Sequence, residues 1–123
     1  MKIIFIDTSS ILFGFSNKRD VFESARARFP GYKQVISLGV LAELSIIAGN
    51  RGKKGECARL ALQAIKYKNV YVEDIVGSVD RWIFSRSLGT PGSIAVTNDT
   101  ELHRKLRSAG VACFKLSRNG ILR

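Results

Sequence analysis

The most constraining feature of the sequence is its first fifteen residues, MKIIFIDTSSILFGF. An unbroken apolar run, residues 3–6, stands directly before Asp7 and a group of small hydroxyl residues. A run this short cannot span a membrane and is typical of a buried parallel strand that opens into a helix. Ligands of open α/β sheets bind at the carboxyl ends of strands, so Asp7 occupies a candidate functional position. The alternative for Asp7 alone is a helix cap or an Asx turn.

Similar apolar runs recur between amphipathic segments along the rest of the chain. The further predicted strands are residues 33–37, 70–72, 94–96 and 111–116. The predicted helices are residues 8–15, a segment that begins near residue 20, and residues 39–48, 56–67, 79–88 and 100–109. Residues 50–55 (NRGKKG) are predicted as a loop and residues 116–123 as a short tail. Because helical crossovers return the chain in the same direction, this alternation predicts a mostly parallel sheet.

Four acidic residues are predicted to meet at one edge of this sheet. If the fourth strand returns beside the first, a crevice opens at the carboxyl ends of these two strands, where Asp7 and Asp99 lie. Glu43 and Asp80 lie near the starts of helices that follow the second and third strands. Each acid has a local explanation, such as capping for Asp99 or a favourable first-turn charge for Asp80. Those explanations do not predict that all four gather at one edge.

The chain is strongly basic, with 20 Lys and Arg against 10 Asp and Glu and a net charge of +10. This surplus favours a polyanionic partner, with nucleic acid ahead of a membrane surface, although a merely soluble basic protein is the alternative. Two groups of cations are candidate nucleic-acid contacts, one on the outer face of the last helix and one in the predicted glycine loop, for which a solvated turn is the alternative. They are Lys53, Lys54, Arg104, Lys105 and Arg107. His103 is predicted on the exposed side of that helix, as a surface or phosphate-contacting residue.

Carboxylates packed closely together repel one another unless a proton or a divalent cation relieves the repulsion. Oxygen ligands without cysteine or buried histidine favour Mg²⁺ or Mn²⁺ over Zn²⁺. Cys57 and Cys113 lack CxxC spacing and are predicted to be reduced core residues. With 123 residues and 46% hydrophobic composition, we expect a single cytoplasmic domain, residues 1–123, without a secretory leader.

At this point four segments match a known family. DTSSILF at Asp7, LAEL at Glu43, VDRWIF at Asp80 and VTNDTELHRKL at Asp99 resemble, in order, the four acidic motifs of PIN-domain nucleases. The resemblance covers essentially the whole chain and implies a three-layer α/β/α sandwich around a central, mostly parallel sheet of about five strands. It is closest to archaeal relatives of the small-subunit processome nucleases, with VapC-type toxins next. The processome branch usually carries a second Asp in the third motif, where this chain has Arg81.

The resemblance implies a Mg²⁺- or Mn²⁺-dependent endoribonuclease acting in rRNA processing. The acidic cluster would be Asp7, Glu43, Asp80 and Asp99, supported by hydrogen bonds from Thr8, Ser9, Thr97 and Asn98. Water activated by the metal would attack phosphorus. The alternatives are a VapC-type toxin with an antitoxin partner and a non-catalytic RNA-binding PIN module, which Arg81 favours. In this family a homodimer is a common assembly.

Overall fold

A computed structural model describes residues 2–123 and contains five strands and six helices. In chain order they are β1 (Ile3–Ile6), α1 (Thr8–Ser16), α2 (Val21–Arg28), β2 (Lys33–Ser37), α3 (Leu38–Ala48), α4 (Gly52–Tyr67), β3 (Tyr71–Glu73), α5 (Val79–Gly89), β4 (Ile94–Val96), α6 (Thr100–Ser108) and β5 (Ala112–Phe114). The predicted α/β class is therefore confirmed, and the bounds of β2 and β4 agree with the sequence prediction.

All neighbouring strands are parallel, in the order β3-β2-β1-β4-β5. The winding reverses between β1 and β4, as the sequence predicts, because the chain returns from the β3 edge to the other side of β1. Right-handed crossovers in opposite directions place their helices on opposite faces of a sheet. Every residue of β1 and β4 is buried, and alternate side chains of a strand point to opposite faces, so helices cover both faces.

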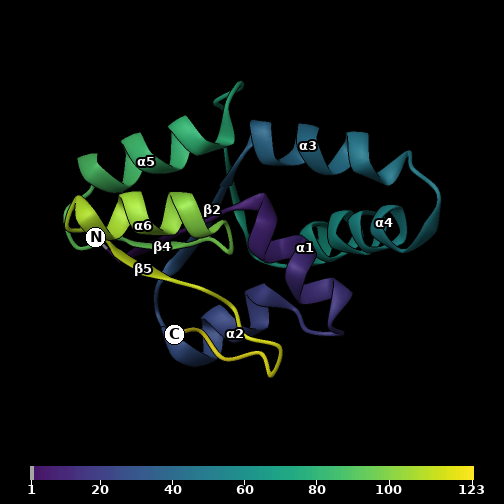
Figure 1. Cartoon of the computed structure of the whole chain (residues 1–123), viewed down its shortest axis with the longest axis horizontal. Helices are drawn as coiled ribbons and strands as arrows, with labels where there is room; N and C mark the ends of the chain where they lie inside the picture. Colours follow the sequence, from purple (N-terminus) through teal and green to yellow (C-terminus); the bar gives the residue numbers. More distant parts are fainter. Residues whose placement is uncertain (1) are drawn as a thin grey trace.

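The helices fall into two groups around the sheet (Figure 1). Helices α1, α3 and α4 contact one another and α2 contacts α1, whereas α5 packs on β1 and β4 and α6 packs on β5. A core of aliphatic side chains fills the space between these layers, and Trp82 of α5 packs edge-on against Phe5 of β1 with ring centroids 5.7 Å apart. The core thus fixes the start of α5 relative to the end of β1.

The structure corrects one prediction of local structure and extends another. Residues 52–55 belong to the first turn of α4 instead of a loop. Gly55 lies close to the preceding turn, where an added Cβ would be 2.0 Å from the Asn50 carbonyl oxygen, so the glycine permits a close approach here and does not mark a loop. Residues 116–123, predicted as a short tail, fold back into a bridged turn. Leu116 and Leu122 form an antiparallel bridge and are each only 2% exposed, so their burial holds the chain end on the core.

The cysteine prediction is confirmed, since Cys57 and Cys113 are free and buried. Within residues 2–123 no helix has the length and apolar character needed to cross a membrane.

Candidate active site

Asp7 lies at the carboxyl end of β1 and is only 4% exposed. Its backbone N–H donates to the Val96 carbonyl oxygen at 2.9 Å, which joins it to the end of β4. Asp7 Oδ2 accepts hydrogen bonds from Ser9 Oγ at 2.7 Å and from Thr97 Oγ1 at 2.6 Å. Across residues 2–123 we find no hydrogen bond to Oδ1. One carboxylate oxygen is therefore held in place and the other is available to a ligand.

The electrostatic surroundings of Asp7 disfavour its charged form. Burial raises the pKa of Asp7 above its ordinary value of 3.8, and the hydrogen bonds from Thr97 and Ser9 lower it only in part. The negative charges of Asp80 and Glu43 raise the pKa of Asp7 further. A buried carboxylate that also feels two other carboxylates is stabilised by a proton or a cation. Asp7 thus feels the charges of two of the other predicted acids at this edge of the sheet.

The loop after β4 is tied to the start of α1 by a network of polar side chains. Thr97 Oγ1 accepts from the Asp99 backbone N–H at 3.1 Å, and Ser9 Oγ accepts from the Asn98 backbone N–H at 2.9 Å. The amide of Asn98 bonds both backbone groups of Leu116, with Oδ1 3.0 Å from the nitrogen and Nδ2 2.9 Å from the oxygen. Ser9, Thr97 and Asn98 thus make hydrogen bonds of the kind that the resemblance implies, and their supporting role in a reaction stays a prediction.

Sequence reasoning missed Ser10 as a member of this network. Ser10 is fully buried, and its Oγ donates to Asn98 Oδ1 at 2.7 Å, linking α1 to the loop after β4. The sequence contains a feature that could have indicated this role, because Ser10 belongs to the run of hydroxyl residues that follows Asp7. Thr8 behaves differently from its neighbours. Its buried Oγ1 has no hydrogen-bond partner within residues 2–123, so its supporting role stays a prediction.

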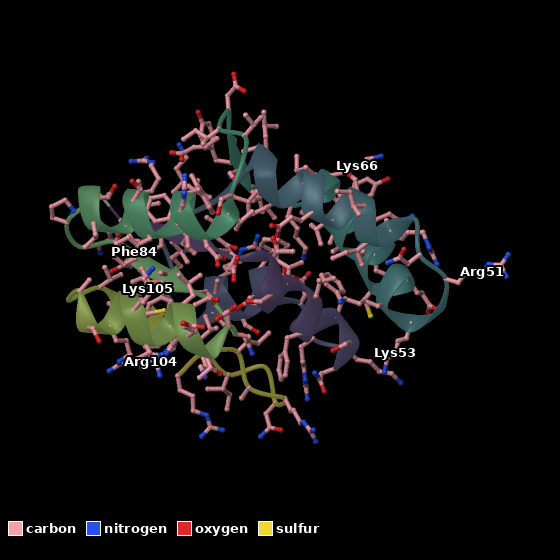
Figure 2. The ribbon with its side chains drawn as sticks, turned by 45° about the horizontal axis from the view of Figure 1, so that its top comes forward. Arg51, Lys53, Lys66, Phe84, Arg104 and Lys105 are labelled. Atoms are coloured by element: carbon pink, nitrogen blue, oxygen red, sulfur yellow. The ribbon has the colours of Figure 1, made fainter. Side chains whose placement is uncertain are left out.

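Asp80 and Asp99 face a shared pocket of about 540 Å³ between α5 and α6. Asp99 also caps α6, because its Oδ1 accepts from the Leu102 backbone N–H at 2.9 Å. Figure 2 shows Phe84 of α5 and Lys105 of α6 reaching toward one another beside this pocket. Lys105 Nζ lies 5.1 Å from the centre of the Phe84 ring. Glu101 and Arg81 also line it, so the pocket combines three carboxylates with an aromatic face and two cations.

The four acids are grouped more loosely than a preformed metal site. Asp7 is buried, whereas Glu43, Asp80 and Asp99 are exposed. Asp80 lies three residues before buried Ile83 on α5, so the two share a helix face, but Asp80 itself is exposed in the first turn. In the part of the chain that the structure describes, no three His, Cys, Asp or Glu side chains lie close enough together to hold a metal ion.

A fifth acid, Glu73, ends β3 at the same edge but is already neutralised. Glu73 accepts hydrogen bonds from Trp82 Nε1 at 2.8 Å and from Arg86 Nη2 at 2.6 Å. Arg81 is exposed and lines the pocket with Asp80, yet no ion pair joins them within residues 2–123. The guanidinium next to Asp80 therefore leaves its carboxylate free.

The predicted RNA-contacting cations differ in their surroundings. Lys53 and Lys54 lie in the first turn of α4, beside an apolar pocket between α4 and α1, and Arg104 projects from the exposed face of α6 (Figure 2). Arg107 Nη1 donates to the Cys113 carbonyl oxygen at 3.2 Å, which gives it a structural contact with β5. Only Lys105 among them lines the acidic pocket.

The prediction that His103 lies on the exposed side of α6 is wrong. The residue is half-buried, and its Nε2 has no hydrogen-bond partner within residues 2–123. Burial lowers the pKa of His103, as do the nearby charges of Lys115 and Arg107. A neutral imidazole is a poor phosphate contact, because it offers no positive charge.

The chain resembles known proteins in both sequence and fold. The sequence profile of a family described as "PIN like domain" matches residues 4–119. A solved structure of the PIN domain endonuclease Utp24 superposes with a TM-score of 0.79 at 25% identity, covering 98% of this chain and 89% of that chain. A domain of a functionally unknown protein from Methanocaldococcus jannaschii DSM 2661 has a TM-score of 0.66 at 19% identity, covering 95% and 92% respectively, and shares the fold. A search of curated protein sequences finds no match.

Proposed function

The chain belongs to the PIN-like domain family, and on this premise we propose that it is a metal-dependent endoribonuclease that hydrolyses RNA phosphodiester bonds. Its fold is that of a PIN-domain nuclease, as the sequence motifs predict. One observation carries the proposal: the buried Asp7 carboxylate has an oxygen without a hydrogen bond and a pKa raised by burial and by two neighbouring acids. Such a group gains stability from a bound cation.

The donor set fits a hard divalent cation. Asp7, Asp80, Asp99 and Glu43 offer only oxygen atoms, which suit Mg²⁺ or Mn²⁺. The orphaned buried Oγ1 of Thr8, the residue after Asp7, is a further oxygen without a partner. A divalent cation supplies positive charge that neutralises a phosphate and makes water easier to deprotonate. Asp80 and Glu43 are exposed, and the proposal requires their carboxylates to turn toward Asp7 when the cation binds.

The residues of the site have distinct tasks in this proposal. Asp7 and Asp99 would hold the principal cation, and Thr97 and Ser9 fix the orientation of the Asp7 carboxylate. Asp80 and Glu43 complete the ligand set or accept a proton from the attacking water. Lys105 lines the pocket, where its positive charge attracts the phosphate backbone.

RNA is the proposed substrate, for two reasons. The relative of known structure is described as the endonuclease Utp24, and the net charge of +10 suits a polyanion. We further propose a role in rRNA processing in the cytoplasm, with a homodimer as the assembly to test. A VapC-type toxin controlled by an antitoxin shares the same chemistry and differs only in target and partner.

A non-catalytic RNA-binding module is the second candidate, and Arg81 is the observation that favours it. Arg81 adds a positive charge to the pocket that contains Asp80 and Asp99. A positive charge there opposes cation binding.

Cleavage of a labelled single-stranded RNA in Mn²⁺ tests the proposal, with Asp7→Asn as the central variant. We expect this variant to lose cleavage while it binds RNA as tightly as the parent, because the substitution removes a ligand without touching the cations. Glu56→Gln is the matched control, since Glu56 is an exposed acid on α4 outside the site. Cleavage that survives in Asp7→Asn would show that the site is wrong. A parent chain that binds RNA but never cleaves it would favour the non-catalytic module.

A further inference from the structure

A second pocket lies at the opposite edge of the sheet from Asp7, at the amino ends of β2 and β3. Its volume is about 530 Å³, within the range of small-molecule sites. The residues that define it chemically are Arg26, Tyr32, Lys33, Gln34, Asn69 and Tyr71. Lys33 begins β2 and Ser37 ends it, so roughly 13 Å of strand separates this pocket from the acidic edge. The pocket is therefore distinct from the candidate active site.

The lining combines aromatic faces with cations. Tyr71 is 51% exposed, and Lys33 Nζ lies 3.9 Å from the centre of its ring. Lys2 Nζ lies 5.7 Å from the ring centre of Tyr32. Within residues 2–123 neither lysine has an ion-pair partner, so their positive charge is available to a ligand. Arg26 is less available because it pairs with Glu23 at 3.1 Å.

The pocket also presents side-chain amides. Gln34 is only 7% exposed, and its Nε2 donates to the Phe22 carbonyl oxygen at 2.9 Å. Its Oε1 has no hydrogen-bond partner within residues 2–123, although buried acceptors are normally paired. Asn69 lines the same pocket and is exposed. Amide side chains of this kind pair with the donor and acceptor groups of nucleobases.

We propose that this pocket, which we call the basal pocket, binds a nucleotide of single-stranded RNA. Unstacked bases bind on aromatic side chains, and nearby lysines attract the adjoining phosphates. The amides of Gln34 and Asn69 add hydrogen bonds to the base edge, which neither an acidic peptide nor a lipid surface requires. The site goes beyond the proposed cleavage activity, because it engages RNA away from the acidic edge.

Binding measured without metal tests the proposal separately from cleavage. The probe is a fluorescein-labelled single-stranded RNA, titrated in EDTA with the full chain carrying Asp7→Asn and read by fluorescence anisotropy. Adding Lys33→Ala and Tyr71→Ala is expected to weaken binding about tenfold, because one base–aromatic stack is lost. The slope of affinity against salt is expected to fall by about 0.7, because one phosphate contact is lost.

Lys66→Ala with Tyr67→Ala is the matched control, because it makes the same chemical changes at an exposed lysine and an exposed tyrosine outside the pocket. The control pair is expected to bind as the parent does. Equal losses in the two pairs, or an affinity in the Lys33 and Tyr71 pair within about twofold of the parent, would overturn the proposal.

Adenosine monophosphate gives a second readout in the same EDTA buffer. By ¹⁵N NMR, its addition is expected to shift the side-chain amide signals of Gln34 and Asn69, while those of Asn98 beside the acidic edge stay in place. Shifts at Asn98 alone would contradict the basal pocket. Neither measurement depends on cleavage, so failure of the proposed enzyme activity would be seen independently.

Discussion

Thr97 Oγ1 donates a hydrogen bond of 2.6 Å to Asp7 Oδ2 across a separation of 90 residues in sequence. The same oxygen accepts the Asp99 backbone N–H at 3.1 Å, so one hydroxyl connects the two aspartates at the ends of β1 and β4. Thr97 is fully buried, and its own backbone N–H is bonded to the Phe114 carbonyl oxygen at 3.1 Å. Its side chain therefore sets the orientation of the Asp7 carboxylate from a rigid strand end.

Replacing this hydroxyl is the first prediction. Thr97→Val keeps the shape of the side chain but removes the donor, so we expect a loss of about 1 kcal/mol in the free energy of unfolding. Cleavage and metal affinity are expected to fall roughly tenfold or more, as for other groups that orient metal ligands. Thr97→Ser retains the hydroxyl and is expected to stay closer to the parent in activity. Urea unfolding and initial cleavage rates measure both effects, and equal activity in the two variants would contradict the orienting role.

The pH dependence of stability supplies the second prediction. The pKa of Asp7 is raised in the folded chain, so its carboxylate opposes folding once the pH rises above its ordinary value of 3.8. The stability associated with protonated Asp7 is fully present below that value and is lost as the pH rises through the folded pKa. In EDTA, Asp7→Asn is therefore expected to be more stable than the parent at about pH 7 and to lose this advantage in acid. Thermal unfolding across this pH range measures the difference, and a variant less stable than the parent at neutral pH would contradict it.

The sequence predicted the sheet better than it predicted the surroundings of each acid. The reversal between β1 and β4 follows from the order of buried strands, and with it the proximity of Asp7 and Thr97. The exposure of Asp80 could not be predicted from helix periodicity. Periodicity tells which residues share one side of a helix, but it does not tell how deeply a residue in the first turn is buried. The beginning of α4 was missed for a similar reason. In the sequence, Gly55 is typical of a loop. In the structure, its missing side chain lets the backbone of α4 lie close to the Asn50 carbonyl oxygen.

The ion pairing of Glu73 could not be predicted from spacing alone either. Its partner Arg86 lies on the next helix, and whether their side chains meet depends on how α5 packs on the sheet. The side-chain amide of Asn98 likewise bonds Leu116, which lies beyond β5. Long-range polar pairs of this kind depend on tertiary packing, which the local pattern of residues does not encode.

Arg81 provides the third prediction. Arg81→Asp replaces a positive charge in the acidic pocket with a negative one, as in the processome branch of the family, so we expect tighter Mn²⁺ binding. A change of roughly 1 kcal/mol, or about fivefold in affinity, is appropriate for charges at an exposed site. Calorimetric titration with Mn²⁺ measures it. Arg51→Asp makes the same change at the amino-terminal cap of α4 and is expected to leave Mn²⁺ affinity nearly unchanged, so equal gains would point to net charge alone.

The cations of α6 give the fourth prediction. Lys105 faces the acidic pocket beside Phe84, whereas Arg107 is occupied by the Cys113 carbonyl oxygen. Lys105→Ala is therefore expected to weaken RNA binding and to lower its salt slope by about 0.7, the value for one phosphate contact on a single strand. Arg107→Ala is expected to reduce stability more than RNA affinity. Anisotropy at several salt concentrations separates these effects, and an unchanged slope in Lys105→Ala would reject the contact.

The last prediction concerns the attachment of α5, which carries Asp80. Glu73 at the end of β3 accepts from Trp82 Nε1 and from the guanidinium of Arg86, and the Arg86 hydrogen bond is the main reason that the pKa of Glu73 is lowered from 4.5. Because the pKa of Glu73 is lower in the folded chain, its carboxylate stabilises the fold at pH values above its ordinary pKa of 4.5. This stabilisation is lost as the pH falls through the folded pKa.

Glu73→Gln is expected to cost about 1 to 3 kcal/mol at neutral pH, because a charge-assisted hydrogen bond becomes a neutral one. The cost should shrink in acid, where the parent also loses its carboxylate. Trp82 is the single tryptophan and packs on Phe5, so its fluorescence reports directly on this contact during urea unfolding. Glu56→Gln on the exposed face of α4 is the control with the same chemical change. If both variants unfold at the same urea concentration as the parent, Glu73 does not hold α5 to the sheet, and another contact must fix the position of Asp80.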